Sequence, residues 1–118
     1  MAFDIKELYW AAGFLEGEGT FHLLKRPSRS RGFDFRVTCP QVQKEPLVRL
    51  QKLFGGTFHV RKPRTEREQP CWVWNVCGAR ARGVALTVFS LMSEKRKTQI
   101  KKMLDVPFWN IYKARGCL

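Results

Sequence analysis

Apolar side chains recur every three to four residues in three parts of the chain, and this spacing predicts three helices that each bury one side. The segments are 5–18, 45–54 and 79–92. The first has a capping-box-like start at Asp4 and Glu7, and Gly19 after it suits a left-handed helix end. In the second, Leu47, Leu50, Leu53 and Phe54 share one side, while in the third we expect burial of Val84, Leu86, Val88, Phe89 and Leu91.

Apolar and polar residues alternate one by one in four segments between these helices, and this two-residue repeat predicts four strands. They cover about 20–25, 33–39, 57–62 and 71–77. Pro40 should end or bulge the second strand near Val42. The inward residues include Phe58 and Val60 in the third strand and Trp72, Trp74 and Val76 in the fourth.

The C-terminal quarter is expected to be helical. Ser93 should cap a fourth, lysine-rich helix that breaks around Asp105 to Pro107. The tail beyond it, rich in aromatic residues, is expected to dock as a short final helix. We therefore predict an α+β domain spanning residues 1–118, because one domain is what 118 residues can support.

The first predicted helix carries almost no side chain on one face and an acid at its end. Gly13 and Gly17 lie four residues apart, beside Ala12 and Glu16. Each glycine costs roughly 1 kcal/mol relative to alanine within a helix, so two of them indicate a close helix-to-helix contact. Glu18 lies where the helix dipole is negative, and two such helices side by side would bring together two carboxylates that a cation would neutralise.

Residues 10–19, W-A-A-G-F-L-E-G-E-G, resemble the LAGLIDADG motif of homing endonucleases, with Glu16 and Glu18 in its two acidic positions. The resemblance extends over nearly the whole chain and implies the family's α-β-β-α-β-β-α order, with a four-stranded antiparallel saddle sheet packed on helices. Because the chain has one copy of the motif, the resemblance also implies a homodimer. The expected interface comprises Ala12, Gly13, Glu16 and Gly17, with Glu16 making interface or helix-end hydrogen bonds rather than binding metal.

The resemblance also implies a metal-dependent phosphodiester hydrolase. Glu18 would bind a divalent cation, expected to be Mg²⁺, with help from the carbonyl of Gly19. Gln43 matches a solvent-positioning glutamine, and Arg96 stands where the family usually has a lysine, a role that Lys95 or Lys97 could take. Leu47 occupies the place of a family arginine, for which Arg49 is a possible substitute.

Charge points to a polyanionic partner. Lys and Arg number 22 against 10 Asp and Glu, a net charge of +12. The chain has no run of about 18 apolar residues and no signal-peptide core, so a soluble intracellular protein is expected, in a bacterial or phage cytoplasm or in a chloroplast or mitochondrion. The four cysteines lack metal-binding spacing and are expected to be thiols rather than zinc ligands.

Polar residues of the strands and loops are expected to contact duplex DNA. They come from the two arginine-rich loops, from the strand face opposite the core and from the fourth helix: Arg26, Arg29, Arg31, Arg36, Thr38, His59, Arg61, Arg64, Arg67, Asn75 and Lys95. His22 is expected to be a DNA contact or a polar strand residue rather than a metal ligand.

The resemblance thus implies a homodimeric, Mg²⁺-dependent DNA endonuclease, encoded by a mobile intron or a similar element. It would cut a long pseudo-palindromic site and need neither a membrane nor a small-molecule substrate. The alternative is a protein of the same fold that binds without cutting, either an inactive DNA-binding protein or an intron RNA maturase. A small basic RNA-binding protein would explain the charge but not Gly13, Gly17 and Glu18 together.

Overall fold

A computed structural model describes residues 4–25 and 33–105. Its helices and strands are α1 (Ile5–Glu18), β1 (Thr20–Lys25), β2 (Phe33–Gln41), α2 (Glu45–Phe54), β3 (Thr57–Arg61), β4 (Cys71–Cys77), α3 (Gly78–Val88), the 3-10 turn η1 (Phe89–Leu91) and α4 (Glu94–Leu104). The predicted α+β order is confirmed. The predictions for Arg26, Arg29, Arg31, Cys117 and the aromatic tail fall outside the described residues.

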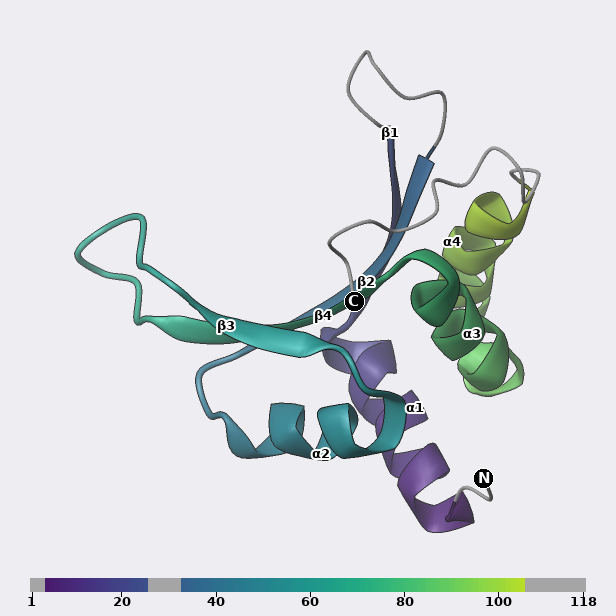
Figure 1. Ribbon diagram of the computed structural model, residues 1–118, viewed down its shortest axis with the longest axis horizontal. Helices are drawn as coiled ribbons and strands as arrows, with labels where there is room; N and C mark the ends of the chain where they lie inside the picture. Colours follow the sequence, from purple (N-terminus) through teal and green to yellow (C-terminus); the bar gives the residue numbers. More distant parts are fainter. Residues whose placement is uncertain (1–3, 26–32, 106–118) are drawn as a thin grey trace.

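The four strands form one antiparallel sheet in the order β1-β2-β4-β3. Figure 1 shows this sheet curved into a trough, with α1 and α2 under one part of its convex side and α3 and α4 beside the other. The concave side carries no described helix (Figure 1). The predicted saddle-shaped sheet packed on helices is therefore confirmed.

The core lies between the convex side of the sheet and the helices. Side chains on alternate strand positions enter it from the sheet, among them Phe35, Val37 and Trp74, each with no exposed surface. Trp74 also donates its indole N–H to the carbonyl of Gly55, 2.9 Å away, at the end of α2. Burial of the apolar strand face is what fixes which polar residues point to the concave side, because successive side chains of a strand alternate.

Several local predictions were wrong. Pro40 itself pairs in register opposite Val73, although β2 does end near Val42 as predicted, at Gln41. Val60 is 50% exposed because no described helix covers that end of β3. The third helix stops at Val88, four residues early, and Leu86 and Leu91 are exposed. Neighbouring packing, which local periodicity does not encode, decides these positions.

Both ends of α1 differ from the predicted caps. Asp4 accepts a hydrogen bond from the backbone N–H of Lys6 at 2.9 Å, but Glu7 pairs with Arg49 instead of completing a capping box. Gly19 has φ −85°, outside the left-handed region. A glycine is required there for space, since a Cβ would lie 2.8 Å from the carbonyl oxygen of Leu15.

Candidate functional site

Glu18 is the last residue of α1 and its side chain is exposed. Its carboxylate makes no hydrogen bond or ion pair with the described part of the chain. The strand β2 passes close by: burial raises the pKa of the Cys39 thiol to about 12, and the charge of Glu18 contributes to the rise. An acid left unpaired at the negative end of a helix is a position that favours a bound cation.

Glu18 opens onto a hollow of about 460 Å³ between the end of α1 and the ends of three strands. The hollow is lined by Glu18, Pro40, Gln41, Val42, Arg61, Lys62, Glu68, Gln69 and Cys71. Gln43, the predicted solvent-positioning residue, is exposed but does not line it. Gln41 does, so the structure brings a different glutamine to Glu18.

Gln41 was not among the predicted site residues, although the sequence carries a signal for it. Gln41 follows Cys39 at the two-residue repeat of β2, and Cys39 lies beside Glu18. Extending the alternation of the strand through Pro40 would have placed Gln41 on the same side. The other missed lining residues, Lys62, Glu68 and Gln69, lie in the β3–β4 connection, where sequence offers no periodicity.

Hydrogen bonds at Glu16, two residues before Glu18, join the end of α1 to the start of α4. The Glu16 carboxylate accepts hydrogen bonds from the backbone N–H of Ser93 at 2.6 Å and from its hydroxyl at 2.8 Å. In return, Nε of Arg96 donates to the carbonyl oxygen of Glu16 at 3.0 Å. Each group meets the oppositely charged end of a helix, an arrangement that stabilises both termini.

Glu16 therefore makes helix-end hydrogen bonds, one of the two roles predicted for it. The same contact gives Arg96 a partner within the chain, the carbonyl of Glu16. The guanidinium also donates to the side-chain oxygen of Gln99 at 3.1 Å, and only 14% of the Arg96 side chain is exposed. Lys97 points elsewhere, with Nζ 3.8 Å from Glu94 and 5.8 Å from the ring centre of Phe89. Neither contact is with Glu18. Lys95 is exposed at the same end of α4.

Arg49 does not take the place of the family arginine. Its guanidinium stacks 3.9 Å from the ring centre of Trp10, and its Nε donates to both Glu7 carboxylate oxygens at 3.0 and 2.7 Å. Glu7 precedes Glu18 by eleven residues, which is about 16 Å of helix. Arg49 therefore links α2 to the far end of α1.

The Glu16 contact predicts a pH-dependent part of the stability. Its hydrogen bond from the Ser93 backbone lowers the pKa of the Glu16 carboxyl, so the ionised form favours the folded state. The stabilisation is complete above the ordinary pKa of a glutamate, about 4.3, and is lost as the pH falls through the lower pKa of the folded state. Glu16→Gln should lower the melting temperature at pH 7 by about 2–6 °C, measured by circular dichroism.

The control for this variant is Glu94→Gln, because Glu94 starts α4 but its side chain is 88% exposed. It should melt close to the wild type at pH 7. The difference between wild type and Glu16→Gln should shrink on acidification to about pH 3.5. A difference independent of pH would contradict the assignment of stability to the ionised Glu16.

The small face of α1 is open in the single chain. Gly13 and Gly17 are exposed, and a Cβ on either would have no atom of the described residues within 4 Å. Ile5 and Tyr9 continue this row at four-residue spacing toward the N-terminus, each 57% exposed. Ala12, predicted to lie on this face, is instead 3% exposed and packs in the core.

The concave side of the sheet presents polar side chains in rows that cross the strands. One row runs through Thr20, Thr38, Asn75 and Thr57, which lie opposite one another in register. Thr38 and Asn75, both predicted DNA contacts, therefore share this face, and so does His59, which lies opposite Val73. Hydroxyl, amide and imidazole groups on a surface that no described helix covers are suited to hydrogen bonding with base edges.

The next row joins His22 to Arg36. Arg36 forms an ion pair with Asp34 at 2.7 Å, and Asp34 is 5% exposed. Burial and the neighbouring Arg36 lower the pKa of His22, while Asp34 opposes the shift. His22 is therefore neutral near pH 7, so it can both donate and accept a hydrogen bond.

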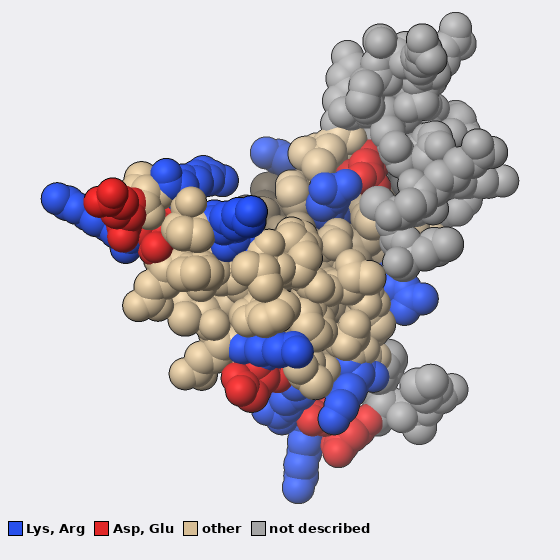
Figure 2. All heavy atoms as spheres, turned by 60° about the vertical axis from the view of Figure 1, so that its left-hand side comes forward, with Lys and Arg blue, Asp and Glu red and all other residues tan. Residues whose placement is uncertain are grey.

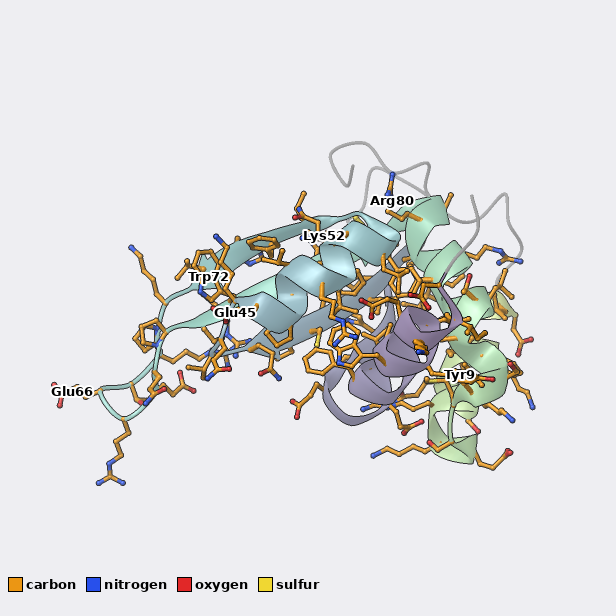
Figure 3. All side chains as sticks on the ribbon, turned by 90° about the horizontal axis from the view of Figure 1, so that it is seen from below. Tyr9, Glu45, Lys52, Glu66, Trp72 and Arg80 are labelled. Atoms are coloured by element: carbon orange, nitrogen blue, oxygen red, sulfur yellow. The ribbon has the colours of Figure 1, made fainter. Side chains whose placement is uncertain are left out.

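The β3–β4 connection projects beyond the body of the molecule and carries the basic residues predicted there. Figure 2 shows Lys and Arg side chains gathered on this projection beside acidic ones. In Figure 3, viewed from the helix side, Glu66 marks its tip. Arg61, Arg64 and Arg67 are all exposed, which leaves their charges available to a polyanion.

The donors around Glu18 fit a hard divalent cation. A carboxylate and the carbonyls of a helix C-terminus are oxygen ligands of the kind that Mg²⁺ prefers. Within residues 4–25 and 33–105, no three His, Cys, Asp or Glu side chains are grouped closely enough to hold an ion. Cys39 is protonated at neutral pH because of its raised pKa, so it offers no thiolate. The described helices also include none long and apolar enough to cross a membrane.

Comparison with solved structures identifies the fold. The chain is similar to the homing endonuclease I-CvuI in complex with its target, with a TM-score of 0.66 and 20% identity over 86% of this chain and 67% of that one. It is also similar to I-Vdi141I, an archaeal intron-encoded homing endonuclease complexed with DNA, with a TM-score of 0.62 and 21% identity over 82% of this chain and 64% of that one.

A third structure, the LAGLIDADG meganuclease I-CpaMI bound to uncleaved DNA, gives a TM-score of 0.64 and 20% identity over 89% of this chain. The chain spans 38% of I-CpaMI and about two thirds of the length of the other two. No protein-family model and no curated protein sequence matches it. The chain has the LAGLIDADG homing endonuclease fold, as the motif at residues 10–19 predicted.

Proposed function

We propose that the chain is a site-specific double-stranded DNA endonuclease that acts as a homodimer with Mg²⁺. The observation that carries this proposal is the position of Glu18, a carboxylate with no partner among the described residues, at the end of a helix whose small face is open. Two chains joined through Gly13 and Gly17 would bring two copies of Glu18 together at the centre of a continuous basic trough. The structures of similar fold are DNA complexes of homing endonucleases, which supports duplex DNA as the partner.

Glu18 and the carbonyl of Gly19 would hold the cation. A divalent metal at this position supplies Lewis-acid stabilisation of the developing phosphate charge and lowers the pKa of water. Gln41 lies in the same hollow as Glu18, and its amide can orient solvent there. Arg61 and Lys62, which also line this hollow, would bind and position the phosphate backbone.

Arg96 is assigned a supporting role in this proposal. Because it binds the carbonyl of Glu16, it holds the last turn of α1, and hence Glu18, in a fixed place relative to α4. This replaces the direct electrostatic role that the sequence predicted for it. Among the basic residues at that end of α4, Lys95 is the one whose exposed position leaves it available to DNA.

A nicking assay tests the proposal. A plasmid library carrying random inserts is incubated with the purified protein, with Mg²⁺ or with a chelator, and cut ends are sequenced. We expect Mg²⁺-dependent cuts at one recurring sequence. Sequence-specific binding without cleavage would leave a DNA-binding protein of the same fold, and absence of both would reject the proposal.

Binding to DNA should be strongly salt dependent. If Arg61, Arg64 and Arg67 each neutralise a phosphate, replacing all three with glutamine should reduce the slope of log affinity against log salt concentration by about 2.7. Fluorescence anisotropy with the selected duplex, over a series of potassium chloride concentrations, measures this slope.

The matched control removes three charges from exposed lysines on the helices, Lys6, Lys52 and Lys102. Lys52 lies on α2, on the convex side (Figure 3). This variant should keep the wild-type slope, since these residues do not face the trough. Equal losses of slope in the two variants would show that the β3–β4 arginines have no special contact with phosphate.

A further inference from the structure

Asn75 lies on the concave side of the sheet, at the floor of the trough, and a neighbouring side chain holds its amide in place. It lies on β4 between Trp74 and Val76, which are 0% and 1% exposed on the core side. Alternation along the strand therefore points Asn75 to the concave side. Its Nδ2 donates a hydrogen bond to the hydroxyl oxygen of Thr57, directly opposite on β3, at 3.2 Å.

This bond uses one of the two N–H groups of the Asn75 amide. The second N–H and the Oδ1 atom make no hydrogen bond with the described part of the chain. The two free groups belong to one planar amide, so they form a donor and an acceptor side by side. Thr57 fixes the orientation of that plane, which lowers the entropy lost when a ligand binds.

An adjacent donor and acceptor of this kind match one base. In the major groove, adenine offers N7 as an acceptor next to the N6 amino group as a donor, and an asparagine amide can bind both at once. Guanine has an acceptor, O6, where adenine has the N6 amino group. O6 would face Oδ1 of Asn75, which is also an acceptor, so no hydrogen bond could form there. We infer that Asn75, oriented by Thr57, selects adenine at one base pair of each half-site, an inference that rests on the proposed function.

The first test compares target selection by four proteins. Wild type, Asn75→Ala, Thr57→Val and Thr20→Val each bind a randomised duplex DNA library in the presence of a chelator, and the bound DNA is sequenced. Thr20 is the matched control, because it occupies the same row but its side-chain hydroxyl makes no hydrogen bond with the described residues. The wild type should favour adenine over guanine at one position by roughly 5- to 150-fold.

Asn75→Ala should lose that preference and keep the others, Thr57→Val should weaken it, and Thr20→Val should leave it intact. If the wild type enriches no sequence, the proposed function fails and this inference fails with it. If the wild type enriches a sequence and Asn75→Ala enriches the same one at every position, only this inference is overturned.

The second test changes the DNA instead of the protein, so it does not depend on the folding of a variant. Replacing the selected adenine with 7-deazaadenine removes the N7 acceptor and preserves base pairing. Wild-type binding should weaken by about 2- to 10-fold, the loss of one hydrogen bond. Asn75→Ala should be insensitive to the replacement. No loss with the wild type, or the same loss with both proteins, overturns the inference.

Discussion

Glu18→Gln is expected to lower strand cleavage by at least about 10³-fold while leaving DNA binding in a chelator unchanged. Glutamine keeps the volume of the side chain but removes the charge that would hold the cation. His59 and Asn75, which are proposed to contact DNA, lie on the sheet, so their contacts should be unaffected. Single-turnover cleavage of the selected duplex measures the first effect, and anisotropy measures the second.

The same substitution should not destabilise the protein. The Glu18 carboxylate makes no bond with the described residues and lies at the negative end of α1, so its removal relieves a small repulsion. The melting temperature should hold or rise slightly.

Glu16→Gln is expected to have the opposite effects on stability and cleavage from those of Glu18→Gln. It removes a carboxylate bonded to Ser93, so it should melt lower but retain cleavage within an order of magnitude at 25 °C. Glu18→Gln cleavage within an order of magnitude of wild type would remove Glu18 from the catalytic residues. The nuclease proposal would then lose the observation on which it rests.

Gly13→Leu is expected to convert the dimer to a monomer. Symmetry places two copies of residue 13 near one contact, and a leucine on each would separate the helices, where overpacking costs about 1–3 kcal/mol or more. Within one chain the substitution meets no obstacle, since a Cβ at Gly13 would have nothing within 4 Å. Sedimentation equilibrium should therefore show a folded monomer, and cleavage of both strands should be lost.

Gly83→Leu is the matched control. Gly83 is also an exposed glycine within a helix, with nothing within 4 Å of its Cβ position. Both variants gain helix propensity, worth roughly 1 kcal/mol each, so neither should melt below the wild-type chain measured as a monomer. A dimer of unchanged affinity in Gly13→Leu would exclude the small face of α1 as the interface.

Most of the fold could be predicted because local patterns and tertiary packing agree. The bounds of α1, β1, α2 and β4 match the predicted ones, since each has a clear apolar repeat between marked ends. Predictions failed at the third helix and at Val60, where burial depends on whether another element covers the residue. That information is distributed over the whole chain, outside any short segment.

The candidate site was predicted in part. Glu18 could be singled out because an acid after a small helix face conflicts with the helix dipole, and such conflicts mark functional positions. The roles of Arg96 and Arg49 could not be foreseen. Their partners, the carbonyl of Glu16 and the side chains of Glu7 and Trp10, are 80, 42 and 39 residues away in sequence.

The sequence by itself determined the order of the elements, the two-sided character of the sheet and the identity of the acid at the end of α1. Periodicity and glycine placement encode these features locally. Only the tertiary structure decided that Gln41 and not Gln43 lines the hollow at Glu18, that Ala12 is buried while Gly13 is open, and that Asn75 bonds to Thr57. Each of these depends on strand register and helix docking, which arise from the packing of segments far apart in the chain.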